Sequence, residues 1–574
     1  MKDMQWGARP LGNGRWSFAI WAPEAGEAAL ELGGTTIPVP AVGEGWWRIE
    51  AEAEAGDAYR WAIDGAAYPD PAARAQAGDV HGPSVLVDPA GFTWRAPWQG
   101  RPWHEATIYE LHVGTFTPEG TLTAAKGQLA RLAELGVTMI ELMPLAQFDG
   151  HHGWGYDGVL PYAVHPAYGS PDELRAFVDA AHELGMGVLL DVVYNHFGPS
   201  GNYLGAWCKA FFHAERASPW GQGIAFEEPA VREFFIANAL HWLEEYRFDG
   251  LRLDAVHAIE DHSAKHFLDE LGERIRSREW GRPIHLVTED ERNLARYFTS
   301  DAPFDGTWND DWHHAVHCLL TGENESYYAP FAVDPVGDIA VALGDGYVEQ
   351  GQARPSGDEK PRGEASGDLP RTAFVNFLGN HDQVGNRARG ERLHQLVTDC
   401  HALRVATALT LLTPFVPMLF MGDEFLTDAP FLFFADFSGD LAEAVRKGRA
   451  QEFARFSSFG GEVPDPIAPE TFRQCRIGSP ARAEQSEHEQ FVHGLLALRA
   501  RHVVPMLGRN ALPTSSVHRE GADITAQWSF APGTLFVKAR LGTGDRPFEP
   551  HSQPIFQLTD ASSPFAFSAA VSPE

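Results

Sequence analysis

The sequence predicts a multidomain α/β protein with a central closed (β/α)8 TIM barrel, an N-terminal β-sandwich and a small C-terminal β domain. The chain of 574 residues is too long for one ordinary domain. Its middle part alternates β-branched runs with helical periodicity, which is typical of a parallel sheet. Its two ends contain short alternating runs between turn residues. The expected domains are residues 1–95, 96–504 and 505–574.

The N-terminal part contains the alternation expected of a sandwich. Polar and apolar residues alternate over four short runs, and turn residues separate these runs at sandwich-like spacing. The four expected strands are Trp16–Trp21, Ala29–Leu32, Trp46–Ile49 and Tyr59–Ile63.

The central part provides eight strand candidates in order, most of them followed by helix-like sequence. One helix has a clear beginning, because Ser170 is a good N-cap, Pro171 suits the first helical position and Glu173 completes a capping box. Eight strands in this arrangement close most economically into a barrel. The candidates are Ile108–Phe116, Val137–Leu145, Val188–Val193, Gly250–Leu253, Ile284–Thr288, Phe304–Trp308, Ala373–Leu378 and Val416–Met421.

Two features are expected toward the C-terminal end. Residues 351–370 are rich in Gly, Pro and charge without an apolar anchor, which predicts a mobile loop. A last helix is expected near Gln490–Arg501, before the C-terminal β domain.

Charge and cysteine usage exclude several partners and locations. The formal net charge is −33, from 45 Lys and Arg against 78 Asp and Glu, so phosphate backbones and anionic membranes are repelled. We expect no nucleic acid and no membrane partner. Four widely spaced cysteines and a start without an apolar signal segment predict a cytoplasmic protein with reduced thiols.

Charged residues gather where four predicted strands end. In such barrels, reactive groups project from the carboxyl ends of the strands. Each residue alone has a simpler explanation, since an Asp can cap a helix, a His can be a satisfied core residue and Arg252 can be a salt-bridge partner. Four clusters at four strand ends favour a common site. They are Asp191–His196, Asp249–Asp254, Thr288–Asp290 and Asn380–Asp382.

Glycoside cleavage accounts for this chemistry. An oxocarbenium-like transition state requires one carboxylate below the sugar ring and one carboxylic acid beside the leaving oxygen. Asp254 and Glu289 suit these two positions, and Arg252 lies two residues before Asp254 on the same strand face. His196 and His381 are expected to donate to sugar hydroxyls.

The motifs DVVYNH, GLRLDAVH, TED and NHD, in this order, resemble the signature regions of the α-amylase superfamily of glycoside hydrolases. The resemblance covers about Trp103 to Glu424. It implies that Asp254 is the nucleophile, Glu289 the general acid/base and Asp382 the transition-state stabiliser. It also implies that Tyr156, Arg252 and His257 contact the sugar. For Tyr156, the alternative role is packing in the protein core. The N-terminal module looks like the sandwich of branching and debranching members.

Three runs resemble one branch of that superfamily more closely, the maltooligosyltrehalose trehalohydrolases. They are Glu289–Asn293, Asn309–His314 and Asn380–Arg387. The resemblance implies retaining cleavage of the α-1,4 bond next to the terminal trehalose of maltooligosyltrehalose or a related α-glucan. The implied substrate contacts are Asp310, Asp311, Trp312, His313, His314, Gln383 and Asn386. For the Asn309–His314 run, the alternative is helix capping or core packing.

The same resemblance implies neither a cofactor nor a required metal. Asn195 matches the residue that many amylases use for a structural calcium, but the companion carboxylate loop is not evident in the sequence. His313 and His317 are spaced four apart, as zinc ligands can be, but no third and fourth ligand accompany them. We therefore expect no metal site.

Other functions remain open from the sequence. A 1,4-α-glucan branching enzyme is the nearest, followed by a debranching enzyme or a maltogenic amylase. A non-catalytic carbohydrate-binding protein on the same barrel is the alternative from another class. It is disfavoured because Arg252, Asp254, Glu289 and Asp382 occur together.

Overall fold

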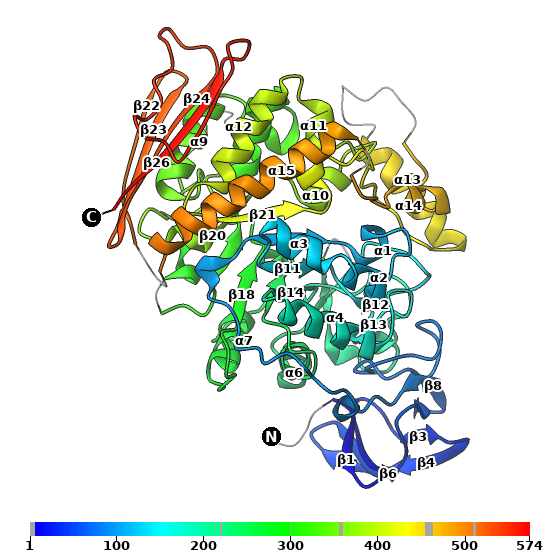
Figure 1. The fold of residues 1–574 in the computed structure, drawn as a ribbon. Helices are drawn as coiled ribbons and strands as arrows, with labels where there is room; N and C mark the ends of the chain where they lie inside the picture. Colours follow the sequence, from blue (N-terminus) through cyan, green and yellow to red (C-terminus); the bar gives the residue numbers. More distant parts are fainter. Residues whose placement is uncertain are drawn as a thin grey trace.

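The computed structural model describes residues 6–218, 221–299, 301–354, 360–453, 463–480, 482–508 and 512–573. Two small sheets lie at one end, the barrel in the middle and a single sheet at the opposite end (Figure 1). Parts of four expectations fall outside the described residues: 355–359 of the predicted loop, 1–5 of the first domain, 219–220, 300, 355–359, 454–462 and 481 of the central domain, and 509–511 and 574 of the last. The domain boundaries at 95/96 and 504/505 stay predictions.

The N-terminal part consists of two antiparallel sheets, as expected. The first has the order β1-β2-β6-β5 and the second β4-β3-β7-β8, with β9 on β7. Phe18 of the first sheet contacts Tyr59 of the second at 5.3 Å between ring centroids, so the two sheets pack face to face. The strands are β1 Gly7–Gly12, β2 Arg15–Trp21, β3 Ala28–Leu32, β4 Thr35–Val39, β5 Ala41–Gly43, β6 Trp46–Glu52, β7 Ala58–Ile63, β8 Ala66–Tyr68 and β9 Ser84–Val85.

The central part is a closed barrel of eight parallel strands, which confirms the predicted fold class. Strand β21 closes it by pairing with β10, where Met418 stands opposite Ile108. All eight predicted strands are present: β10 Ile108–Leu111, β11 Met139–Leu142, β14 Gly187–Val192, β17 Gly250–Leu253, β18 His285–Thr288, β19 Gly306–Trp308, β20 Phe374–Phe377 and β21 Val416–Phe420.

The first strand is shorter than predicted. Strand β10 ends at Leu111, and Val113–Phe116 forms the short helix α1. Because α1 is buried like the strand before it, the apolar run continues without marking the change of structure.

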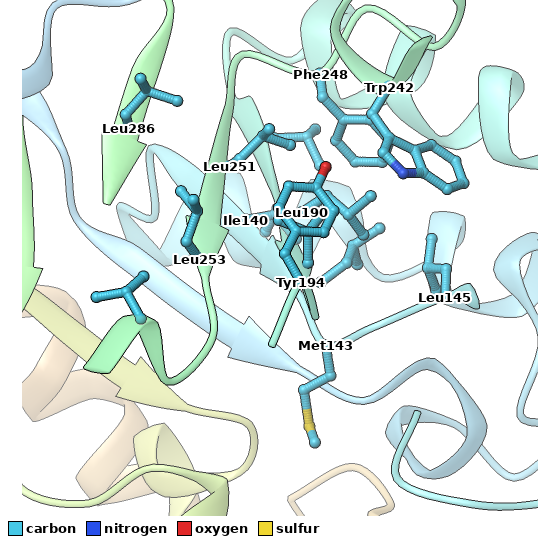
Figure 2. Close-up of a cluster of buried hydrophobic side chains, with 14 of the residues drawn as sticks. Ile140, Met143, Leu145, Leu190, Tyr194, Trp242, Phe248, Leu251, Leu253 and Leu286 are labelled. Carbon is cyan, nitrogen blue, oxygen red and sulfur yellow. The ribbon is translucent and has the colours of Figure 1, made fainter. Parts of the chain in front are cut away.

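Strand alternation gives the barrel two apolar layers. Inward-facing residues such as Ile108, Met139 and Val375 form the interior layer. Figure 2 shows outward-facing residues of β11, β14, β17 and β18 in a buried cluster that also contains Trp242 of helix α6 (Pro229–Glu245). Both layers are buried, which holds the strand ends at fixed positions.

The predicted capping box is present at the start of α4 (Pro171–Glu183). The Ser170 hydroxyl accepts from the Glu173 N–H, and the Glu173 carboxylate accepts from the Ser170 N–H. The last predicted helix also exists, but α15 begins earlier, at Ala483, and ends at Leu498.

The C-terminal sheet has the order β22-β23-β24-β26-β25. Its Trp528 is buried, and its indole N–H donates to the carbonyl oxygen of Leu343 on α9 (Pro335–Asp345). The sheet is therefore attached to a barrel helix. Its strands are β22 Thr514–Glu520, β23 Asp523–Phe530, β24 Gly533–Leu541, β25 Phe556–Thr559 and β26 Phe565–Pro573.

The described residues of the 351–370 segment form neither helix nor strand, as expected, but charged contacts hold them. Arg354 makes two hydrogen bonds to the carboxylate of Asp338, at 2.8 and 2.6 Å. Arg362 contacts Glu349 and Asp311. In the part of the chain that the structure describes, no helix is both long and apolar enough to cross a bilayer.

Candidate active site

The centre of the site is built from the ends of three neighbouring barrel strands. Asp191 on β14 stands opposite Arg252 on β17 in the strand register. Asp254 directly follows β17, and Glu289 directly follows β18. Because alternate side chains of a strand point the same way, Arg252 and Asp254 both face the inside of the barrel at its carboxyl end.

Arg252 contacts three carboxylates. Its Nη1 donates to Asp191 Oδ2 at 2.6 Å and to Asp254 Oδ1 at 2.9 Å, and its Nη2 donates to Glu289 Oε2 at 2.5 Å. The guanidinium lies 4.0 Å from the ring centroid of Trp308. We call Asp191, Arg252, Asp254 and Glu289 the carboxylate hub. Since a guanidinium keeps its charge when buried, the hub presents one permanent positive charge to three acids.

Two further donors orient the outer carboxylates of the hub. The Asn195 side-chain amide donates at 2.8 Å to Asp254 Oδ2 and, at the same distance, to the Asp254 carbonyl oxygen. The backbone N–H of Ala255 donates to Glu289 Oε2 at 2.9 Å. Ala255 has a φ of 40°, in the left-handed region that a residue with a side chain seldom adopts. Such strain is typical of functional sites, and here it accompanies the contact with Glu289.

Exposure increases from the base of the site to its rim. The exposed fraction of the side chain is 0% for Arg252, 11% for Asp254, 18% for Glu289 and 36% for Asp382. Burial raises the pKa of Asp191 to about 7; Arg252 opposes this effect and the charge of Asp254 adds to it. The two carboxyl groups that follow β17 and β18 therefore keep a small exposed surface above the fully buried Arg252.

Helix α10 (His381–Gly385) brings a fourth carboxylate to the rim. Asn380 caps this helix by accepting from the N–H groups of Asp382 and Gln383. His381 Nε2 lies 3.4 Å from Asp382 Oδ2. The His381 ring stacks on Tyr156 at 5.1 Å, and the Tyr156 hydroxyl donates to Asp191 Oδ2 at 2.7 Å. Residues from three separate motifs thus surround the hub.

His196 lies beneath this group. Its Nδ1 contacts Asn195 Oδ1, and its Nε2 lies 3.0 Å from the Tyr156 carbonyl oxygen. The ring is buried and both of its nitrogens have protein partners, which argues against the predicted donation to a sugar hydroxyl. It connects the loop of Tyr156 to the amide that holds Asp254.

The predicted substrate-binding run Asn309–His314 starts helix α8 (Asp310–Thr321), which separates its members. Asp310 is half-buried near the site, and the Gln383 side-chain amide donates to its Oδ1 at 3.3 Å. Burial raises the pKa of Asp310 to about 8, and the charges of Glu289 and Asp382 add to this effect. Asp310 therefore belongs to the rim.

Asp311 is buried and anchors the chain below the rim. Its Oδ2 accepts from the N–H groups of Val348 and Glu349, both at 2.8 Å, and from the Asn293 amide at 2.9 Å. Its Oδ1 accepts from Arg362 at 3.1 Å. Because both oxygens already have protein partners, the structure argues against the predicted substrate contact of Asp311.

Trp312 and His313 are buried as well, and their predicted contacts need the same correction. Trp312 has no exposed surface. His313 Nδ1 lies 2.8 Å from the Leu378 carbonyl oxygen, and its Nε2 lies 2.9 Å from the Tyr328 hydroxyl. On a helix, residues that follow one another point in different directions, so a continuous polar run is divided between rim and interior.

The remaining predicted residues lie around the rim. His314 is buried, with its ring 5.1 Å from that of the exposed Tyr327. Asn386 is exposed, and its amide donates to Asp382 Oδ1 at 3.4 Å. His257 is half-buried, with its Nε2 3.9 Å from Glu291 Oε1.

Three residues near the site were not singled out from the sequence as site residues. Glu110 contacts His381, Trp308 lies under Arg252, and Tyr327 is a 44% exposed aromatic beside His314. Glu110 could have been found from the sequence, because it is a carboxylate within the apolar run of a predicted strand. Trp308 and Tyr327 had no comparable signal.

The described residues contain no group of three or more His, Cys, Asp and Glu side chains arranged to hold a metal ion. The rings of His313 and His317 each have a protein partner, since His317 Nε2 lies 2.9 Å from Glu323 Oε2. The amide oxygen of Asn195 contacts His196.

Comparisons with known proteins agree with this geometry. The model of the α-amylase catalytic domain matches residues 73–220. Malto-oligosyltrehalose trehalohydrolase from Deinococcus radiodurans is 42% identical over 94% of this chain and 88% of its own length. The Rhizobium sp. (strain M-11) enzyme of the same name is 41% identical over 91% of this chain and 90% of its own. A branching enzyme from Bacillus caldolyticus matches at 30% identity but covers 56% of this chain and 57% of its own length.

A solved structure from Salmonella typhimurium, provisionally named an α-amylase, superposes with a TM-score of 0.92 and 45% identity over 99% of each chain. Both trehalohydrolases share about 40% identity with this chain across almost its whole length, whereas the branching enzyme matches about half of the chain. The chain therefore belongs to the malto-oligosyltrehalose trehalohydrolase family of the α-amylase superfamily of glycoside hydrolases.

Proposed function

We propose that this site hydrolyses the α-1,4-glucosidic bond next to the terminal trehalose of maltooligosyltrehalose, with retention of configuration, and releases trehalose. The observation that carries the proposal is the pair of hydrogen bonds from one guanidinium, Arg252, to Asp254 and Glu289. The planar guanidinium of Arg252 thus holds these two partly exposed carboxyl groups close to each other. Retaining glycosidases need such a close pair, about 5–5.5 Å apart.

Asp254 is proposed as the nucleophile. Both of its oxygens accept hydrogen bonds, from Arg252 and from Asn195. These donors hold the carboxylate in one orientation. The carboxylate attacks the anomeric carbon, and a covalent glycosyl ester forms while the bond to the leaving oxygen breaks.

Glu289 is proposed as the general acid/base. Its Oε2 receives hydrogen bonds from Arg252 and from the Ala255 N–H, so Oε1 is the oxygen left to carry the transferred proton. Glu289 first protonates the leaving oxygen of the trehalose unit. It then takes a proton from the water that hydrolyses the ester.

Asp382 is proposed to stabilise the transition state at the rim, next to His381. We propose that four residues around the hub contact the sugars, because each is at least partly exposed: Asp310, Gln383, Asn386 and His257. His314 is buried beside the exposed Tyr327 and is proposed as a further contact. Tyr156 is half-buried against His381, and we propose that it borders the sugar bound at the cleavage position. Asp311, Trp312 and His313 act as supports in this proposal.

Products formed from maltotriosyltrehalose test the reaction. We expect free trehalose and maltotriose, measured by chromatography, and Asp254→Asn as the control should release neither. Absence of trehalose would reject the proposal. Loss of iodine staining of amylose without new reducing ends would instead indicate branching activity.

A cytoplasmic location is proposed as well. The four cysteines are unpaired in the structure, and three of them are buried. Reduced thiols are usual in that compartment. Fractionation of cells that produce the protein, with a periplasmic marker as control, tests the location.

A further inference from the structure

Glu110 is a buried carboxylate on the first barrel strand, and the proposed reaction gives it no role. It stands opposite Glu141 on β11 and Phe420 on β21 in the strand register. Ile108, two residues earlier, belongs to the interior layer, so Glu110 also points into the barrel. It is 1% exposed. A carboxylate at such a position requires partners, since an unpaired buried charge is strongly unfavourable.

Both oxygens of Glu110 contact one residue, His381. Oε1 lies 2.5 Å from His381 Nδ1, and Oε2 accepts from the His381 backbone N–H at 3.2 Å. The two residues are 271 positions apart in the chain. Glu110 therefore fixes both the ring and the main chain of the residue that starts α10.

The other ring nitrogen of His381 faces the site. Nε2 lies 3.4 Å from Asp382 Oδ2. A charged ring is attracted to both carboxylates, through a hydrogen bond to Glu110 on one side and an ion-pair contact with Asp382 on the other. A neutral ring has only one N–H and no positive charge, so the attraction to Asp382 is lost.

The surroundings of His381 favour the charged ring. Burial alone favours the neutral form, but the negative charges of Asp382 and Glu110 outweigh it and raise the pKa of His381 to about 9, while Arg252 opposes them. The titratable and charged groups around the ring are Glu110 on β10, Glu141 on β11, Asp191 on β14, Arg252 on β17, His112 before α1, the Tyr156 hydroxyl and Asp382.

We propose that Glu110 is a positioning residue that holds His381 as an imidazolium, so that His381 in turn holds the carboxylate of Asp382 at the rim. This inference rests on the proposed function, in which Asp382 stabilises the transition state. When His381 loses its proton at alkaline pH, the carboxylate of Asp382 loses the positive charge beside it and turnover falls. Removal of the Glu110 charge should make His381 lose its proton more easily, so the fall in turnover should occur at lower pH.

Glu141 offers a matched control. It faces Glu110 across the strand register, points into the same interior and is also 1% exposed. Among the described residues, neither of its carboxyl oxygens has a hydrogen-bond partner. Burial raises the pKa of Glu141 well above its usual range. Glu110→Gln and Glu141→Gln therefore make the same substitution on adjacent strands, but only the first removes a charged contact with His381.

The test is the pH dependence of kcat and KM on maltotriosyltrehalose for wild type and both variants, from pH 5 to pH 10. For Glu110→Gln we expect the alkaline fall of kcat to move to lower pH by at least about one unit, with a smaller change in KM. For Glu141→Gln the fall should stay at its wild-type pH. An unchanged alkaline fall in Glu110→Gln, or an equal shift in both variants, would overturn the inference.

Histidine NMR provides a readout that does not depend on activity. The His381 ring signal, assigned by its loss in His381→Asn, should titrate near pH 9 in the wild type and lower in Glu110→Gln. A wild-type titration at or below pH 7 would overturn the inference even if Glu110→Gln did not fold. Failure to release trehalose, with the NMR result as expected, would reject the proposed function alone.

Discussion

The carboxylate hub and the first turn of α8 lie close to each other and have similar residues, but the fold uses them differently. In the hub, acids from three strands converge on one guanidinium. In α8, the consecutive acids Asp310 and Asp311 separate, one toward the rim and one toward the chain beneath it. Neighbouring strands align their ends in register, whereas a helix rotates each residue by about 100° from the last. The ends of neighbouring strands therefore bring functional side chains together, whereas consecutive side chains at the start of a helix point to different places.

The largest expected effect comes from the hub. Glu289→Gln removes the proton donor and should lower kcat by about 10²–10⁴-fold, because the leaving oxygen departs without a proton. Initial rates on maltotriosyltrehalose measure the loss, and an unchanged unfolding temperature shows that the fold is intact. A variant with the wild-type rate would remove Glu289 from the proposed mechanism.

Loss of the central guanidinium should destabilise the protein. Arg252→Met leaves buried Asp191 and the partly buried Asp254 and Glu289 without their shared cation, at a cost of about 3–5 kcal/mol in the free energy of unfolding. Denaturant titration measures the change. Arg482→Met, which removes an exposed pair with Asp428, is the matched control and should change the free energy by about 0–1 kcal/mol. Equal effects of the two variants would contradict the importance of burial.

The charged His381 beside the hub should make stability depend on pH. Its pKa is raised from 6.5 to about 9 in the folded chain, so its contribution is complete below pH 6.5 and is lost as pH rises through 9. We expect up to about 3 kcal/mol less free energy of unfolding at pH 10 from this group. Denaturant titrations at several pH values test it, and Glu110→Gln should flatten the dependence. The same dependence in both proteins would contradict the assignment.

The two acids of α8 should respond differently to the same substitution. The pKa of Asp310 is about 8, so the group is mostly protonated at pH 6, and Asp310→Asn should bind substrate almost normally there. Asp310→Ala should raise KM roughly three- to tenfold, about the worth of one hydrogen bond. Asp311→Asn should leave KM unchanged and lower the unfolding temperature. Steady-state kinetics with thermal unfolding distinguish these outcomes, and a raised KM in Asp311→Asn would return that residue to the rim.

The smallest expected effect is that of metal removal. The Asn195 amide is occupied by Asp254 and His196 rather than by a cluster of carboxylates. Dialysis against a chelator should therefore leave turnover of maltotriosyltrehalose unchanged. Lost activity that calcium restores would show that the hub depends on a cation.

The sequence by itself determined the order of the barrel strands and the identity of the hub. Alternation and turn residues mark each strand, and parallel strands bring their carboxyl ends to one edge, so Arg252, Asp254 and Glu289 follow from local spacing. The ends of elements were less certain: β10 ends at Leu111 because the buried helix α1 continues its apolar run.

Tertiary structure alone decided which residues of α8 reach the rim and which partner each buried charge has. Asp311 meets Arg362 across 51 positions, and Glu110 meets His381 across 271. Local pattern records whether a residue is polar, but these pairs depend on how separate elements rotate and pack. A buried charge is stable only where such packing provides its partner, and spacing along the chain does not specify that partner.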